Sequence, residues 1–533
     1  NTPKTANMTV TMLPRLDTTN TYDRYKWEKS AAGTWERAVD EAERFYAALS
    51  REPSNPEFAE FPITASSTFT APVEDSARLE DVDTRAEMAF RDAWLALRSE
   101  CPTIASWIQH DPKTKSWKRC YESFHDAMDY DAPKDEWLST TFQPLRVESS
   151  IEDWFNTDPP TYKRPTLFFV RRTTPSDGKG LFTGAIFLRC CHDLIDAHGL
   201  LQLMNRLYDL AAKFYTGFTN ARIVSYRQEI ERLCPPVKVA AHLTASPSPT
   251  VQDKFDHLKI ENIKTQTNGP FLGLPISGND SEEGRSSRQS ATLSRETSAR
   301  LLTKCKAKGY TITHALSAAL VLALRNKQPA AEAGTTVMRY AAQAIVSLRH
   351  LDRPDVSSSL ANAATNYHMI APTTVASDVD VSPTRPTSAA REAEEFDALA
   401  AQFREYYVSV RPPAQASSPT FDPDLLEMSP MMWDFFREML SAAKGAAVQP
   451  MASVGVSSLG NISSLVRADR SPFALTDAWV SGEGVGSSIP VMIQTFEGRV
   501  GVSAMHKTQY FDGDFIKVFL DEVLATAVAC MGL

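Results

Sequence analysis

The chain has 533 residues and a mass of 59.0 kDa, so it exceeds one ordinary domain and can bury a sizeable core. Hydrophobic residues make up 43% and charged residues 23% of the sequence, which is the composition of an ordinary soluble globular protein. A net charge of −9 and a pI of about 5.7 argue against nucleic acid or an anionic membrane as the main partner, although a local basic patch can still hold an anionic cofactor.

The seven cysteines are scattered, odd in number and without the spacing of a metal finger, which favours a reducing compartment. The first 16 residues lack the apolar core of a signal peptide. The longest apolar helix candidate, over residues 315–324, is about half a membrane span. We therefore expect a cytoplasmic protein that is not embedded in a membrane.

Apolar periodicity and proline or glycine punctuation define the elements of the first half. In chain order they predict a helix over 34–49, a proline-rich loop over 51–62, a helix over 76–100, strands over 101–108, 166–172 and 184–188, and a helix over 200–215.

Residues 235–290 are rich in proline, serine, glycine and charge, and they are too numerous for an ordinary loop. After them, Ser294 and Thr311 are good helix N-caps and Gly309 is a good helix stop. The remaining patterns predict helices over 294–309, 311–325, 388–408, 425–443 and 515–531, and strands over 340–348, 451–456, 491–496 and 500–505. This alternation predicts a mixed α/β protein with an N-terminal lobe (1–234), a crossover linker (235–290) and a C-terminal lobe (291–533).

The most informative stretch is Cys190–Gly199, which lies between a predicted buried strand and a predicted helix. A neutral imidazole at His192 can take a proton from a hydroxyl group as that hydroxyl attacks a carbonyl. Asp196 can cap the helix or pair with a distant arginine, and Gly199 allows a tight backbone bend.

The pattern His192-x-x-x-Asp196-x-x-Gly199 resembles the HxxxDxxG motif of the coenzyme A-dependent acyltransferase superfamily. That superfamily includes the BAHD-type acyltransferases of plants and fungi, the chloramphenicol acetyltransferases and the condensation domains of peptide synthetases. The supporting segments are AWLALRSECPTIASWI (93–108), ETSARLLTKCKAKGYTITHALSAALVLAL (296–324), AIVSLRHLDRP (344–354) and GVSSLGNI (455–462). The DFGWG box of plant members is absent from the sequence, so the resemblance favours a fungal branch.

This resemblance implies two similar-sized lobes of the chloramphenicol-acetyltransferase type with mixed sheets, a long crossover, and an active-site channel between the lobes. His192 would be the general base, and Asp196 would pair with Arg349 in a structural role, with Gly199 beside them. The donor would be acetyl-CoA as a co-substrate, with no permanently bound cofactor. The acceptor would be a small-molecule alcohol, a terpenoid of fungal secondary metabolism, and the enzyme would act as a monomer.

Other polar residues carry two interpretations each. Ser457, Ser458 and Asn461 flank a predicted S-x-L-G turn and either bind a developing oxyanion or satisfy the turn itself. Asn366 and His198 are expected near the acceptor pocket. A basic group either binds the phosphates of coenzyme A or is a solvated helix end; it comprises Arg300, Lys304, Lys306 and Lys308.

Several alternatives remain open from the sequence. Cys191 could act as a nucleophile beside His192, although adjacent strand residues point to opposite faces. His192, Asp193, Asp196 and His198 have side chains that suit zinc, as in a metal hydrolase, but their spacing is not that of a known zinc motif. A stand-alone condensation-type enzyme would take its acyl group from a carrier protein, and a non-catalytic binding protein of the same fold would not need His192.

Overall fold

The computed structural model describes residues 22–50, 60–73, 78–111, 113–124, 131–173, 180–217, 228–244, 246–278, 284–328, 336–351, 363–385, 388–413, 421–443 and 451–533. Its helices are α1 (Glu41–Ser50), α2 (Leu79–Glu100), α3 (Asp131–Thr141), α4 (Ile151–Phe155), α5 (Ala197–Tyr215), α6 (Val237–Ala240), α7 (Pro249–Thr267), α8 (Arg295–Ala307), α9 (Ile312–Asn326), α10 (Ala389–Val410), α11 (Asp424–Ala443) and α12 (Gly513–Cys530). Its strands are β1 (Glu28–Lys29), β2 (Trp35–Ala38), β3 (Pro62–Pro72), β4 (Trp107–Asp111), β5 (Ser116–Tyr121), β6 (Phe142–Val147), β7 (Thr166–Arg172), β8 (Leu181–Cys191), β9 (Leu274–Pro275), β10 (Ser286–Thr292), β11 (Val337–Ala342), β12 (Ile345–Ser347), β13 (His368–Ile370), β14 (Val375–Asp380), β15 (Met451–Ala452), β16 (Val454–Asn461), β17 (Asp469–Arg470), β18 (Phe473–Gly482), β19 (Ile489–Phe496) and β20 (Arg499–Lys507).

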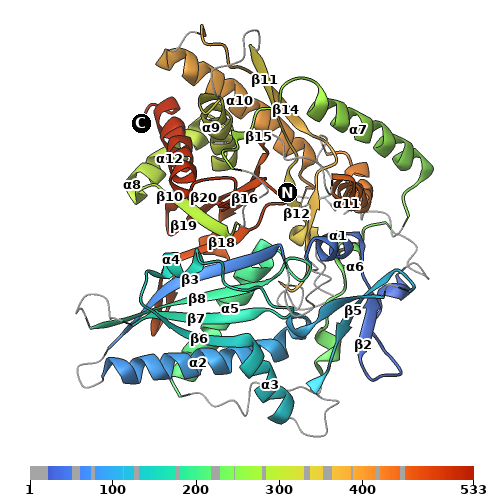
Figure 1. Cartoon of the computed structure of the whole chain (residues 1–533), viewed down its shortest axis with the longest axis vertical. Helices are drawn as coiled ribbons and strands as arrows, with labels where there is room; N and C mark the ends of the chain where they lie inside the picture. The colour runs from blue at the N-terminus through green and yellow to red at the C-terminus, as the bar shows by residue number, and fades with distance from the viewer. Residues whose placement is uncertain are drawn as a thin grey trace, which may run out of the picture.

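The first half of the chain builds a lobe around a six-stranded sheet with the order β17-β18-β3-β8-β7-β6 (Figure 1). Strand β8 pairs with β3 along its whole length, from Leu181 opposite Pro72 to Cys191 opposite Pro62. Strand β18 comes from the second half of the chain and pairs antiparallel with the other edge of β3. Its last residue, Gly482, therefore reaches the same end of the sheet as Cys191.

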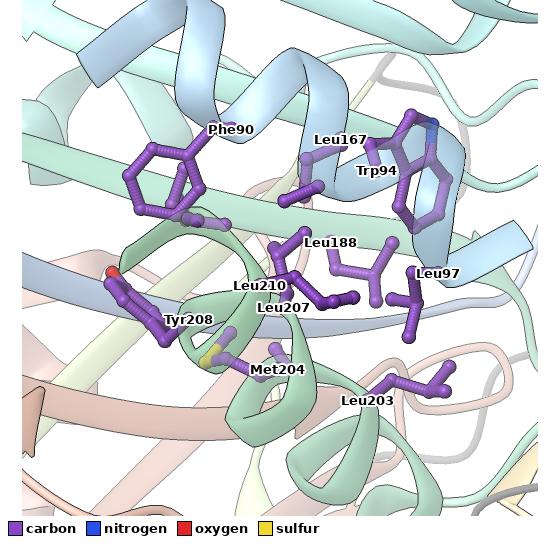
Figure 2. Packing of buried hydrophobic residues seen from close by; sticks show 14 of the residues in the cluster. Phe90, Trp94, Leu97, Leu167, Leu188, Leu203, Met204, Leu207, Tyr208 and Leu210 are labelled. Atoms are coloured by element: carbon purple, nitrogen blue, oxygen red, sulfur yellow. The ribbon is translucent and has the colours of Figure 1, made fainter. Parts of the chain in front are cut away.

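Helices α2 and α5 pack together on one face of this sheet and form the core of the first lobe (Figure 2). Their apolar residues recur at helical spacing, and Figure 2 shows them meeting side chains from β7 and β8. Burying one large apolar side chain contributes about 1.5–3 kcal/mol, so this core holds the start of α5 firmly in place. The residues that meet here include Phe90, Trp94, Leu97, Leu167, Leu188, Leu203, Met204, Leu207 and Tyr208.

The second half builds the other lobe around a four-stranded sheet with the order β10-β20-β19-β16. Helices α8, α9, α10 and α12 lie beside this sheet in Figure 1. As predicted, Ser294 caps α8 and Thr311 caps α9, and α9 is buried from His314 to Arg325. Helix α9 packs against α10 and α12, which explains why its sequence is apolar nearly all round.

Several predicted elements are wrong in detail. Residues 35–38 form strand β2 rather than the first turn of a helix, because they pair with β5 and α1 begins only after Asp40. Residues 340–348 form two strands that pair with different partners, β11 with β14 and β12 with β13. The predicted turn at 457–460 lies within strand β16, where an irregularity in the pairing with β19 falls between Ser458 and Gly460.

The predicted linker is more ordered than its composition indicates. It contains α7, a 19-residue helix that is capped by Ser248 and begins with Pro249, and it also contains the start of β10. Strands β3 and β18, which join the two halves of the chain, were not predicted at all. The division at residues 234 and 290 remains a prediction, although β18 crosses into the first lobe's sheet.

None of the helices within the described ranges is by itself long and apolar enough to cross a membrane. Helices α8 and α9 reach that length and composition only together, and the chain bends by 101° between them.

Candidate active site

His192 lies at the point where the central strand β8 ends and the chain turns towards α5. The turn is closed by a hydrogen bond from the Leu194 N–H to the Cys191 carbonyl (3.2 Å). Asp196 then caps α5, because its Oδ1 accepts the N–H of Gly199 at 2.7 Å. A strand and a helix that are both anchored in the core thus fix the two ends of the motif.

Residues from distant parts of the chain surround the imidazole of His192. The Tyr46 ring from α1 stacks on it with a centroid separation of 4.1 Å and an interplanar angle of 6°, and the Phe61 ring lies 6.0 Å away. The Asn366 Oδ1 lies 3.2 Å from His192 Nδ1, and the Asn366 Nδ2 donates to the His192 carbonyl at 2.7 Å. Gly482, at the end of β18, faces the Cδ2–Nε2 edge, where an added Cβ would lie 3.9 Å from Nε2.

This environment keeps the imidazole neutral. Burial and the neighbouring His368 lower the pKa of His192 to about 4, while Asp196 and the hydrogen bonds with the backbone and Asn366 act in the opposite direction. At pH 7 the ring is therefore unprotonated on one nitrogen and can accept a proton.

Asp196 fills both roles that the sequence left open, helix cap and ion-pair partner. Its Oδ1 accepts Arg349 Nη2 at 2.6 Å as well as the Gly199 N–H, and its Oδ2 accepts the Tyr367 N–H at 2.8 Å. Burial alone would raise the pKa of Asp196, but Arg349 and His368 outweigh it and hold the pKa well below its ordinary value. The predicted Asp196–Arg349 pair is thus present, and it joins the two halves of the chain.

Gly199 is needed for space rather than for a backbone bend. It lies in the first turn of α5, and a Cβ added there would come within 2.1 Å of the Ala363 carbonyl oxygen and 2.7 Å of Arg349 Nη2. The predicted tight bend is therefore wrong as the reason for this glycine. The missing side chain lets the segment that follows residue 362 lie directly against α5.

We expect Gly199→Ala to lower the free energy of unfolding by about 1–3 kcal/mol, the usual cost of overpacking, because a backbone carbonyl must move. Gly455→Ala is the matched control, since an added Cβ there meets no heavy atom within 4 Å. Urea unfolding of both variants checks the prediction, and equal stabilities would contradict it.

A buried network of charged side chains holds the turn that follows His192. Arg119 Nη2 donates to the Asp193 carbonyl at 2.6 Å, and Arg119 Nε pairs with Glu43 at 2.8 Å. Glu43 also pairs with Arg37 at 2.7 Å and lies one turn before Tyr46 on α1. The same carboxylate therefore holds both the turn and the helix that stacks a ring on His192.

Asp40, which accepts the N–H of Glu43 at 2.9 Å, gives this network a pH dependence. Burial and the nearby Glu43 raise the pKa of Asp40 to about 7, above its ordinary value near 4. Between about pH 4 and 7, the Asp40 carboxyl therefore keeps its proton in the folded state and has lost it in the unfolded state. As a result, the contribution of Asp40 to stability falls as the pH rises from about 4 to 7.

We therefore expect the stability of the wild type, relative to Asp40→Asn, to fall between about pH 4 and 7. The slope cannot exceed about 1.4 kcal/mol per pH unit, because one proton is involved. Urea unfolding of both proteins across this range checks the prediction. Parallel stability profiles would show that Asp40 ionises normally.

The residues predicted near an oxyanion do not act alike. Ser458 Oγ bonds Thr313 Oγ1 at 2.7 Å, and the exposed Asn461 side chain caps a short 3₁₀ helix by accepting the Ser463 N–H at 3.2 Å. Ser457 lies on β16 opposite Met492 of β19, two residues before Leu459, which packs against the first lobe's core. His198 is close to Leu459, Asp196 and Arg349, and burial lowers its pKa. None of these contacts tests a role in the reaction, so Ser457, Ser458, Asn461 and His198 all remain predicted site residues.

The contacts of the basic group give less support to its predicted role in binding the phosphates of coenzyme A. Arg300, Lys304, Lys306 and Lys308 are exposed, and Lys308 pairs with Asp397 at 2.7 Å.

Two other chemistries were left open around His192, a cysteine nucleophile and a metal site. The Cys191 Sγ lies 3.8 Å from the Tyr162 carbonyl oxygen. Within the described ranges, no three His, Cys, Asp or Glu side chains lie close enough together to hold a metal ion, so the cluster proposed around His192 and His198 does not form one.

A cavity of about 520 Å³ lies beside residues 181–183, at the opposite end of β8 from His192. Eleven strand residues at about 3.4 Å each separate the two ends by roughly 30 Å, so this cavity is not part of the site.

Sequence reasoning missed three of the groups around the imidazole. Tyr46 was placed on a helix without a role, Phe61 fell in an expected loop, and Gly482 ends a strand that was not predicted. His368 also lies beside His192, with its Nε2 2.9 Å from the Tyr46 hydroxyl and its Nδ1 3.8 Å from Asp196. None of these residues carries a local signal that would place it beside His192.

Comparison with solved structures shows that the fold is shared with an O-acetyltransferase and with condensation-type domains. Trichothecene 15-O-acetyltransferase from Fusarium sporotrichioides is similar with a TM-score of 0.73 and 14% identity, over 95% of this chain and 98% of that one. The first condensation domain of the calcium-dependent antibiotic synthetase has a TM-score of 0.55 and 12% identity, over 94% and 96%. A cyclization-docking bidomain from Sorangium cellulosum has a TM-score of 0.52 and 12% identity, over 93% and 85%.

These likenesses confirm the predicted two-lobed mixed α/β fold. No protein-family model matches the sequence, and no curated protein is significantly similar to it.

Proposed function

We propose that this protein is an O-acyltransferase that moves an acyl group from a thioester to a hydroxyl group, with His192 as the general base. The observation that carries the proposal is the environment of His192. A neutral imidazole is held by Tyr46 and Asn366 at the end of the central strand, in a fold shared with a known O-acetyltransferase.

The reaction needs no covalent enzyme intermediate. His192 Nε2 takes the proton of the acceptor hydroxyl while the oxygen attacks the thioester carbonyl. The tetrahedral intermediate collapses with cleavage of the C–S bond, and the imidazolium returns the proton to the thiolate. The products are an ester and a free thiol. We infer that Ser457 is the candidate donor to the oxyanion and that no resident cofactor takes part.

The finer assignment is an acetyl transfer from acetyl-CoA to a terpenoid alcohol. Length, a single HxxxDxxG motif and a long crossover rich in serine and proline make the sequence resemble the trichothecene 15-O-acetyltransferases. The likeness to the Fusarium sporotrichioides enzyme supports the same choice. We therefore propose a trichothecene C-15 hydroxyl as acceptor, in the secondary metabolism of a fungus, with the enzyme acting as a cytoplasmic monomer.

A condensation-type reaction is the second candidate, and the likeness to condensation domains favours it over other classes. Such an enzyme would take its acyl group from a pantetheinyl carrier protein.

The test is release of free thiol from acetyl-CoA in the presence of a trichothecene that lacks its C-15 acetyl group, with identification of the ester by mass spectrometry. Carrier-bound acetyl thioester serves as the competing donor. Turnover with acetyl-CoA supports the proposal, whereas turnover with the carrier thioester alone would replace it by the second candidate.

A further inference from the structure

Asn366 binds His192 at two points, and together these bonds determine which ring nitrogen carries the proton. The His192 carbonyl can only accept a hydrogen bond, so the group 2.7 Å away must be the amide nitrogen of Asn366. The amide oxygen then faces Nδ1 at 3.2 Å, and an oxygen of this kind can only accept. Nδ1 must therefore carry the hydrogen, which leaves the lone pair on Nε2.

Asn366 is itself held on both sides by the Asp196–Arg349 pair. The carbonyl of Thr365 accepts Arg349 Nη2 at 3.2 Å, and the N–H of Tyr367 donates to Asp196 Oδ2 at 2.8 Å. Asn366 is 1% exposed. The ion pair thus holds the backbone on both sides of Asn366, from which the buried amide reaches His192.

We propose that Asn366 is the positioning residue of His192, that it fixes the tautomer with a free Nε2 lone pair, and that the Asp196–Arg349 pair acts on His192 through it. The free nitrogen lies on the ring edge that faces Gly482. This inference rests on the proposed function for the statement that His192 acts as a base, but the tautomer itself does not depend on any substrate.

The side chain at position 366 is an amide rather than a carboxylate, and this affects the pKa of His192. A neutral partner adds no negative charge beside the ring, and the pKa of His192 stays low, at about 4. Asn366→Asp keeps the shape but places a carboxylate beside Nδ1, which favours the imidazolium and raises that pKa. Asn366→Leu removes both hydrogen bonds.

The test is the nitrogen NMR spectrum of the protein labelled with ¹⁵N-histidine, with His192 assigned from a His192→Gln variant. We expect the wild type to show a protonated Nδ1 and a free Nε2, with no titration between pH 5 and 8. Asn366→Asp should titrate at higher pH than the wild type, and Asn366→Leu should show a mixture of tautomers. A protonated Nε2 in the wild type, or a His192 signal unchanged in both variants, would overturn the proposal.

Asn262→Leu is the matched control, because Asn262 is a buried asparagine on α7 whose amide also makes two hydrogen bonds, to Pro372 and Thr374. Its loss should leave the His192 signals unchanged. If a change appeared equally in this control, general destabilisation would explain it and the proposal would fall.

Kinetics separate this inference from the proposed function. With an active donor and acceptor, Asn366→Leu should lower kcat by about 100-fold with little change in KM, the cost of a misplaced catalytic group. Asn366→Asp should lose activity towards acidic pH where the wild type does not. An equal pH profile for wild type and Asn366→Asp would contradict the positioning role. A wild type that transfers no acyl group would overturn the proposed function, and the NMR result would then decide the tautomer alone.

Discussion

Replacing His192 with alanine is expected to lower kcat/KM for acyl transfer by roughly 10²–10⁴-fold, the usual contribution of a general base. The imidazole is neutral at pH 7, with a pKa lowered to about 4 by burial and by His368, so it is ready to accept a proton. The His192 side chain is only half-buried, so we expect the alanine variant to fold. The rate of thiol release and a urea unfolding curve measure the two effects.

His257→Ala is the control for this prediction, because His257 is an exposed histidine on α7. It should retain wild-type activity. A folded His192→Ala variant with undiminished turnover would remove His192 as the base and with it the proposed mechanism.

Asp196→Ala is expected to have the largest effect on stability. The substitution leaves the partly buried guanidinium of Arg349 without its carboxylate and removes the acceptor of the Gly199 and Tyr367 N–H groups. Breaking a buried pair from one side costs roughly 3–5 kcal/mol. The free energy of unfolding in urea measures this loss.

Two comparisons sharpen this second prediction. The double variant Asp196→Asn, Arg349→Met removes both charges of this pair and so leaves neither one buried without its partner. Its free energy of unfolding should therefore fall by less than the sum of the losses in the two single variants. Asp397→Ala breaks the exposed pair with Lys308 and should cost about 0–1 kcal/mol. If Asp196→Ala cost no more than Asp397→Ala, the ion pair would not hold the two halves of the chain together.

The predicted fold holds where local sequence decides the structure. Helices α8 and α9 carry their own caps at Ser294 and Thr311, and β7 follows its apolar run over 166–172, so both kinds of element were found from the sequence. Strand β18 was missed because its pairing with β3 joins residues about 400 positions apart, and no local pattern encodes that contact. Strand β2 was missed because pairing with β5 overrides a helical pattern of apolar residues.

The candidate site also contains residues that a local motif reveals and residues that only the fold brings together. His192, Asp196 and Gly199 lie in one short motif, and the partner Arg349 was inferred by resemblance and is present. The residues that hold the imidazole, Tyr46 and Asn366, come from α1 and from the segment before β13, and only the folded chain brings them to His192. The role of Asn461 stays a prediction: its Oδ1 caps a short 3₁₀ helix by accepting the Ser463 N–H.

The most direct test of the account is whether the acyl group passes straight from donor to acceptor. Wild-type protein is mixed with acetyl-CoA, with and without the alcohol, while free thiol and the intact mass of the protein are followed. The account predicts thiol release that requires the alcohol and a protein that never carries the acyl group. An acylated protein formed before the alcohol is added, above all one modified at Cys191, would contradict general-base catalysis by His192.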